Sequence, residues 1–430
     1  MILLFELLCT AMILFDYIVH RRIITTISVI SVPYMFILPV NNLFAVKYGF
    51  YPINNEVILM LMLGLFCIFT GSFIADLIFS SGKSYGVKDS EDCVKKLDHF
   101  RMRSMRNFAI IIEGFCMLRL LMFIASYGFS ALSDDETENL VSGIFGHLYL
   151  LVYVLLPFML LYWLKHKKEI LYLFVFVFGV GFGFLSFTKY HSIGLIIMTY
   201  IFVSIEDKKY IKKGAFCIVA AAVLLFVSNY IIGFLFKGNL ANINKDFYIL
   251  HLWKYIGGSV VHDNNLFTSG LNVGVGFIQK ILYCIMPLPN MFLKPLFGYE
   301  YVPPLDFPME AVASNSEESN VIDFIGYMFP SKGDVFDIVV FAVIMICIGI
   351  IFSAVYNCSL KKKQSFAITL CTFMAFFEFL FFFGIFASKS MTWELLVISI
   401  ILPRIFDRRT NLRIGKYYFG GRYDTYETSA

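Results

Sequence analysis

Most of this chain consists of apolar runs long enough to cross a lipid bilayer. A transmembrane helix needs about 20 apolar residues, and the mean hydropathy over 430 residues is +0.76. Backbone polar groups in lipid need internal partners, so such runs have to be helices. We predict an all-α polytopic membrane protein with about 11 spans. Their approximate limits are 2–19, 23–40, 57–79, 107–129, 143–164, 170–187, 192–205, 214–236, 335–355, 366–386 and 391–406.

The distribution of basic residues predicts the orientation of these spans. Of the 35 Lys and Arg residues, 25 fall in alternate loops, which all lie on one side if the spans number eleven. Lys and Arg are enriched in cytoplasmic loops. We therefore predict an outside N-terminus and a cytoplasmic C-terminus. The first apolar run has no basic residue before it, and we interpret it as a span rather than a cleaved signal.

One long loop divides the predicted spans into two groups. The expected organisation is a bundle of about eight spans at 1–236, a large extracytoplasmic loop at 237–334, further spans at 335–406 and a cytoplasmic tail at 407–430. The longest cytoplasmic loop is too short for a nucleotide-binding domain. The sequence contains no Gly-rich phosphate loop, GxSxG motif or metal-spaced Cys/His cluster. Any chemistry is therefore expected on the outer face.

The first half of the large loop is rich in residues that could bind or transfer protons. It contains His251, Lys254, His262 and Asp263. Apolar and polar residues from 247 to 255 follow helical spacing, which predicts a short helix at the membrane surface. Gly257 and Gly258 should end this helix, and a second one should begin near Asp263. The competing interpretation of these residues is a solvated loop surface.

The second half of the loop contains an apolar segment, 271–297, that three prolines interrupt. We interpret it as interfacial or re-entrant helices and not as a twelfth span.

Three further cations lie near the predicted outer face. Arg119 lies within the fourth span, Lys189 lies in the hairpin between the sixth and seventh spans, and Lys237 follows the eighth. A charge within a span is costly unless it is paired or functional. These cations could bind an anionic substrate. Alternatively, Arg119 pairs with another helix and Lys189 belongs to a polar turn that only connects two helices.

The chain resembles the Wzy-type polymerases of O-antigen and capsular polysaccharide, also called oligosaccharide repeat-unit polymerases. Residues 255–267, Tyr-Ile-Gly-Gly-Ser-Val-Val-His-Asp-Asn-Asn-Leu-Phe, resemble the family's Tyr-x-Gly-Gly element in the outer loop. Residues 319–333, Ser-Asn-Val-Ile-Asp-Phe-Ile-Gly-Tyr-Met-Phe-Pro-Ser-Lys-Gly, resemble its Asn-Val-x-Thr-Phe and Asp-Phe-Gly element. Here Asp323 replaces the Thr, and Ser331-Lys332-Gly333 replaces Asp-Phe-Gly. Thr188-Lys189 resembles the family's small-residue and Arg/Lys turn.

This resemblance implies a glycosyltransferase of the C-type architecture in the bacterial cytoplasmic (inner) membrane. Its substrate would be an oligosaccharide repeat unit on undecaprenyl diphosphate, within membrane lipid. The reaction joins such units on the outer face and implies no nucleotide, metal ion or other cofactor. A chain-length regulator is a further partner that the sequence leaves open. We expect no nucleic-acid partner.

The chemistry of such a transfer assigns roles to the candidate residues. Negative charge grows on the departing lipid diphosphate, and fixed cations in a dry site stabilise it. We assign Lys189, Arg119, Lys237 and Lys254 to this role. The acceptor hydroxyl loses a proton to a base, for which His262, His251 and Asp263 are the candidates. The alternatives are an O-antigen ligase-like or other lipid-sugar glycosyltransferase and a transporter of lipid-linked oligosaccharides.

Overall fold

The computed structural model describes residues 1–79, 99–128, 143–185, 189–237, 245–268, 277–298, 309–314, 317–319, 321–330, 334–362, 365–407, 412–414 and 417–419. About 86% of it is helical. Within these residues the strands form two short antiparallel pairs. The first joins β1 (Glu310–Ala311) to β2 (Glu318–Ser319), and the second joins β3 (Leu412–Ile414) to β4 (Tyr417–Phe419).

Each predicted span coincides with a helix in the described part of the chain. These helices are α1 (Ile2–His20), α2 (Thr26–Leu43), α3 (Asn55–Phe79), α4 (His99–Tyr127), α5 (Ile144–Lys165), α6 (Ile170–Leu185), α7 (Lys189–Glu206), α8 (Tyr210–Lys237), α15 (Val335–Lys362), α16 (Ser365–Phe379) and α17 (Ser390–Asp407). Within the described residues, seven helices are long and apolar enough to cross a membrane by length and composition. The prediction of an all-α polytopic membrane protein is confirmed, and the count of eleven spans stays a prediction.

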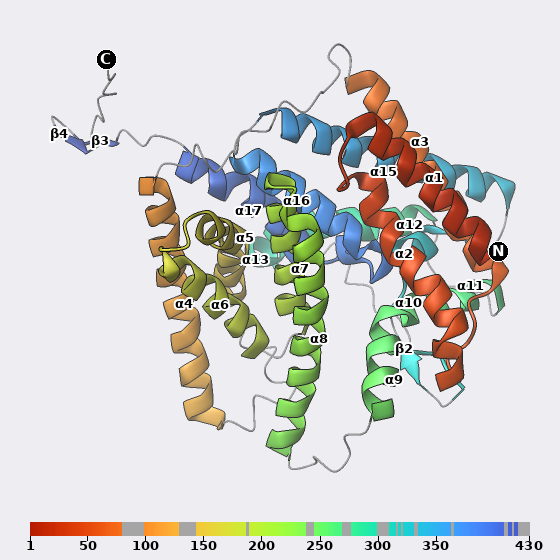
Figure 1. Cartoon of the computed structure of the whole chain (residues 1–430), viewed down its shortest axis with the longest axis horizontal. Helices are drawn as coiled ribbons and strands as arrows, with labels where there is room; N and C mark the ends of the chain where they lie inside the picture. The colour runs from red at the N-terminus through yellow and green to blue at the C-terminus, as the bar shows by residue number, and fades with distance from the viewer. Residues whose placement is uncertain are drawn as a thin grey trace.

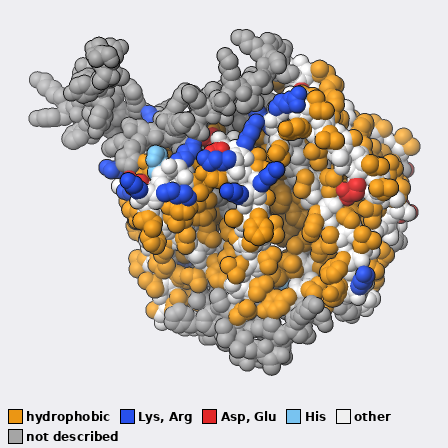
Figure 2. Space-filling model, in the orientation of Figure 1, with side chains coloured by type: hydrophobic (Ala, Val, Ile, Leu, Met, Phe, Trp, Pro, Cys, Tyr) orange, Lys and Arg blue, Asp and Glu red, His pale blue; other side chains and the backbone are white. Residues whose placement is uncertain are grey.

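The surface fits a membrane environment. Figure 2 shows a broad apolar surface on one face, with Lys and Arg side chains gathered along its upper edge. Figure 1 shows α4, α5 and α6 on one side of the molecule, α1, α2 and α3 on the other, and α7 and α8 between them. In lipid, an apolar surface of this kind needs no protein partner to cover it.

Helices α3 and α15 are packed backbone to backbone. A Cβ atom on Gly71 of α3 would collide with the carbonyl group of Ile346, and one on Gly349 of α15 would collide with that of Ile68. Helices in lipid associate largely through close packing, which small residues permit. The two glycines therefore allow these helices to approach far more closely than larger residues would.

This helix pair is parallel. Phe341, near the start of α15, lies beside Gly64 in the first half of α3. At the other end, Asn357 donates a hydrogen bond of 2.6 Å to Asp76. Two parallel helices that both span a membrane require an odd number of crossings between them. The five spans predicted between α3 and α15 satisfy this requirement.

The large loop folds into six short helices within the described residues. They are α9 (Lys245–Ile256), α10 (Gly258–His262), α11 (Asn264–Thr268), α12 (Phe277–Ile285), α13 (Pro287–Phe297) and α14 (Phe324–Met328). The predicted surface segment is helical in α9, and Gly257 follows its end as expected. The helix expected near Asp263 is α11, which begins one residue later. The segment 271–297 contains α12 and α13, each too short to span a bilayer.

The alternation of basic loops leads to a topological prediction. Fusions of a reporter pair, one active in the cytoplasm and one active outside, should report cytoplasm after Lys168 and Lys213 and outside after Asn264. The reason is that clustered Lys and Arg retain loops in the cytoplasm. A cytoplasmic signal after Asn264 would contradict both the predicted orientation and an outer-face site.

Candidate functional site

The large loop is organised around the buried side chain of Asp323. This residue precedes α14, and its Oδ1 accepts hydrogen bonds from the backbone N–H groups of Ile325 at 2.7 Å and Gly326 at 3.0 Å. A carboxylate at this position satisfies the free donors at a helix N-terminus. The same oxygen accepts the Tyr34 hydroxyl of α2 at 2.9 Å. Asp323 thereby connects the loop to the membrane-spanning helices.

Asp263 brings a second carboxyl group into contact with that of Asp323. Its side chain is fully buried, and it lies directly over the backbone of Gly326. Burial and the neighbouring charge of Asp323 raise the pKa of Asp263 well above its usual range. Two touching carboxyl groups in a dry site cannot both be ionised. We place a proton on Asp263, because three donors already stabilise charge on Asp323, whereas neither oxygen of Asp263 has a hydrogen-bond donor.

His262 lies beside this pair with its two ring nitrogens in different surroundings. Nδ1 lies 3.0 Å from the carbonyl oxygen of Val321. A carbonyl only accepts, so Nδ1 carries the hydrogen and Nε2 carries the lone pair. Burial is the main cause that lowers the pKa of His262. The ring is therefore neutral near pH 7, in the form that a general base requires.

Glu310 connects the buried histidine to the surface. Its Oε2 lies 3.7 Å from Nε2 of His262, and 23% of its side chain is exposed, whereas that of His262 is fully buried. Asn265 of α11 donates a hydrogen bond to the same carboxylate. Glu310 belongs to β1, and β2 of the same hairpin leads into the segment that contains Asp323. A proton could pass between His262 and the surface through this carboxylate.

Lys280 holds the other end of α14. Its ammonium group donates to the carbonyl oxygens of Tyr327 at 2.7 Å and Phe329 at 2.9 Å. Burial lowers the pKa of Lys280 to about 8. A cation at a helix C-terminus interacts favourably with its free carbonyl groups. Asp323 and Lys280 therefore fix both ends of the short helix on which Asp263 rests.

The structure brings together only some of the predicted site residues. His262 and Asp263 meet the second resembling segment, and the side chains of both are fully buried. Lys254 contacts the β1–β2 hairpin, because its ammonium group forms an ion pair of 3.5 Å with Glu317, the residue before β2. The His251 ring packs against the Tyr255 ring, with the two ring centroids 5.2 Å apart.

The other predicted cations lie on the helix bundle. Arg119 is on α4, with its guanidinium 5.5 Å from the ring centroid of Phe145. Lys189 is the first residue of α7, and Lys237 is the last residue of α8. The side chains of these two lysines, and Thr188 and residues 331–333 of the resembling segments, lie outside the described residues. No described contact joins Arg119 to the His262 cluster.

Sequence reasoning missed four residues of this cluster: Tyr34, Lys280, Glu310 and Asp323. The resemblance offered a signal for Asp323, which stood in a quoted motif without an assigned role. Tyr34 lies in an apolar span 289 positions away from its partner. Glu310 and Lys280 belong to no motif, so only the folded chain relates them to His262 and α14.

Comparison with known proteins gives one family match. The model of a family of unknown function, DUF6337, matches residues 48–409. The chain belongs to this family. The match includes the clustered loop residues from Lys254 to Asp323 and excludes Tyr34, which lies before it. No curated protein and no solved structure matches the chain.

The contact between Gly326 and Asp263 can be tested by a small increase in side-chain size. Gly326→Ala should destabilise the protein by about 1–3 kcal/mol, because the added methyl group collides with the fully buried carboxyl group of Asp263. Thermal unfolding of the purified protein measures this effect. Gly181→Ala is the control, since its Cβ would meet no atom within 4 Å. Equal unfolding midpoints for the two variants would contradict the contact.

The raised pKa of Asp263 predicts a pH dependence of stability. A carboxyl group with a raised pKa in the folded state binds more protons there than in the unfolded state, so stability falls as pH rises through that pKa. Asp263→Asn mimics the protonated form and removes this loss. The unfolding temperature of this variant minus that of the natural protein should therefore increase between pH 5 and pH 8.5. Asp334→Asn, at an exposed position of the same loop, is the control. Its unfolding temperature should differ from that of the natural protein by the same amount at each pH.

Proposed function

We propose that this protein is a polymerase that joins undecaprenyl-diphosphate-linked oligosaccharide repeat units into O-antigen or capsular polysaccharide. The observation that carries this proposal is the contact between the two loop segments that resemble the polymerases. His262 and Asp263 of the first segment touch Val321 and Asp323 of the second. Segments about 60 positions apart thus form one cluster that contains a neutral histidine and several carboxyl groups.

The proposal includes a location and an orientation. The protein would reside in the bacterial cytoplasmic membrane with eleven spans, an outside N-terminus and a cytoplasmic C-terminus. The loop between α8 and α15 would then face outward, where lipid-linked repeat units are assembled into polymer. The alternation of basic loops and the parallel packing of α3 and α15 support this arrangement.

The proposed reaction transfers a glycan from its lipid diphosphate to a sugar hydroxyl. The acceptor oxygen forms a bond to the anomeric carbon, and the bond from that carbon to the diphosphate oxygen breaks. The pair of His262 and Glu310 accepts the hydroxyl proton, with Glu310 as the member that reaches the surface. The neutral ring and its lone pair at Nε2 support this role. Asp263 holds a proton already, which makes it a weaker candidate.

Cations would stabilise the departing lipid diphosphate. Lys254 lies on α9 of the same loop, and its ion pair with Glu317 would have to open or be shared. Lys189 and Lys237 lie at the ends of α7 and α8 that face the same side under the proposed topology. Arg119 lies eight residues before the end of α4, about 12 Å along the helix axis. Under this proposal, one lipid-linked substrate would have to contact both regions.

Two other functions use parts of the same arrangement. A ligase-like or other lipid-sugar glycosyltransferase would share the leaving group and the base and differ in its acceptor. A transporter of lipid-linked oligosaccharides would need the cations but no base. The neutral His262 beside Glu310 favours an enzyme over a transporter, and the polymerase is the enzyme whose loop segments the chain resembles.

Substitution of the proposed base tests the reaction. His262→Gln and Glu310→Gln should each lower the rate of chain extension, by about a hundredfold or more for His262→Gln, because the hydroxyl proton loses its acceptor. The assay follows polymer length with purified protein and lipid-linked repeat units. His147→Gln removes the histidine of another His–Glu pair, at the start of α5, and should retain the natural rate. Normal extension by both test variants would exclude this pair as the base.

The proposed diphosphate contact at Lys189 can be tested in cells. Lys189→Ala should abolish polymer while single lipid-linked repeat units remain and the protein stays in the membrane. Lys189→Arg should keep part of the activity, since the requirement is for a cation. Lys47→Ala, an exposed lysine after α2, is the control and should make normal polymer. Normal polymer from Lys189→Ala would reduce this hairpin to a connection between helices.

A further inference from the structure

A second polar cluster lies at the end of α3 that is farther from the His262 cluster. Asp16 and His20 occupy the end of α1, Asp76 lies near the end of α3, and Asn357 lies near the end of α15. The His262 cluster lies near the start of α3, where the backbone N–H group of Asn54 donates a hydrogen bond to the side-chain oxygen of Asn264. The two clusters are therefore about 30 Å apart along this helix. Nothing in the proposed glycan transfer uses the second cluster.

The three titratable groups of this cluster converge on one point. Nε2 of His20 lies 2.8 Å from Oδ2 of Asp76 and 3.4 Å from Oδ1 of Asp16. One ligand atom from each of the three residues lies within 4.8 Å of the other two. Ligands about 2.0–2.1 Å from a tetrahedral metal ion are about 3.4 Å apart. The contact between His20 and Asp76 is shorter than this, so these two side chains would have to move apart only slightly to admit an ion.

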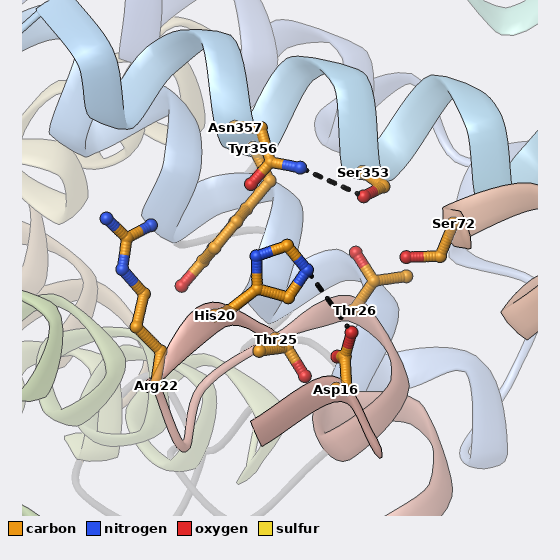
Figure 3. Close-up of a pocket in the computed structure, with 9 residues that line it drawn as sticks. All are labelled: Asp16, His20, Arg22, Thr25, Thr26, Ser72, Ser353, Tyr356 and Asn357. Atoms are coloured by element: carbon orange, nitrogen blue, oxygen red, sulfur yellow. Dashed lines mark hydrogen bonds and ion pairs between the residues drawn. The ribbon is translucent and has the colours of Figure 1, made fainter. Parts of the chain in front are cut away.

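An unpartnered oxygen marks the cluster as incomplete. Asp16 is 4% exposed, and its Oδ2 has no hydrogen-bond partner. Figure 3 shows its carboxylate pointing towards His20 and Thr26 in the same cavity, with Arg22 on the other side of the imidazole ring. A buried carboxylate oxygen without a donor is costly. A cation in this cavity would satisfy it.

The groups around these three side chains include polar partners that suit a bound metal ion. The other oxygen of Asp76 accepts a hydrogen bond of 2.6 Å from Asn357, which orients the carboxylate as outer-shell partners of metal ligands do. Hydroxyl groups of Thr25, Thr26 and Ser72 also line the cavity. The cavity has room for about one water molecule. It would therefore accept a single ion but no organic ligand.

We propose that Asp16, His20 and Asp76 bind one divalent transition-metal ion, such as Zn²⁺ or Mn²⁺. A donor set of one imidazole and two carboxylates suits these ions, whereas Mg²⁺ prefers oxygen ligands and retains its water. The ion would join the end of α1 to the end of α3 and, through Asn357, to α15. This site is independent of the proposed polymerase activity. Its role is to hold these three helices together.

Metal binding to the purified full chain tests the site directly. The protein, with its purification tag removed and treated with a chelator, should take up about one Zn²⁺ or Mn²⁺ per chain and unfold at a higher temperature as a result. Mg²⁺ should cause no comparable shift. Asp16→Asn and His20→Gln should each abolish this uptake, and Asn357→Ala should weaken it by about tenfold. His166→Gln, an exposed histidine elsewhere, should bind as the natural protein does.

A spectroscopic measurement keeps the test independent of how the variants fold. Mn²⁺ bound to the natural protein should show nitrogen coupling from one histidine in pulsed electron paramagnetic resonance. Failure of the natural protein to take up either ion would overturn the proposal. Uptake without nitrogen coupling, or unchanged uptake by folded Asp16→Asn and His20→Gln proteins, would place the ion elsewhere and would also overturn it.

Discussion

The contact between the Asp263 and Asp323 carboxyl groups determines the arrangement of the large loop. Two buried carboxyl groups can remain in contact only if they share a proton or if other groups neutralise them. Asp323 meets this condition through the N-terminus of α14 and the Tyr34 hydroxyl. Gly326 leaves the space that the Asp263 carboxyl group occupies. His262, the next residue in the chain, is thereby held with Nδ1 on the Val321 carbonyl group and Nε2 towards Glu310.

The loop packs against a pair of closely packed helices, α3 and α15. Ile325 of α14 packs against α3 at Gly64, and α3 in turn packs against α15 through Gly71 and Gly349. The far end of the same helix pair carries the cluster of Asp16, His20 and Asp76. A rigid α3 therefore has a polar site at each end, one proposed for glycan transfer and one proposed for a metal ion. Loosening of the glycine contacts should disturb both sites.

The sequence predicted the helices well because lipid imposes a simple rule on them. Apolar length alone located helices such as α3 and α15, and the Gly257–Gly258 pair correctly predicted where α9 ends. The candidate site was predicted only in part, since a pattern in the sequence identifies residue types and not their partners. His262 and Asp263 were singled out for their chemistry, but their burial depends on Asp323, some 60 positions later. The cluster at His20 was missed because one of its carboxylates lies on another helix.

A reaction with purified components tests the proposed glycan transfer most directly. The protein is supplied with lipid-linked oligosaccharide isolated from a host strain that lacks its gene, without any nucleotide sugar. Both chain length and free undecaprenyl diphosphate are measured. A repeat-unit polymerase should lengthen the chains and release one molar equivalent of lipid diphosphate for each unit that it adds. Consumption of no donor, or movement of intact donor across a vesicle membrane without release of lipid diphosphate, would contradict the proposed transfer.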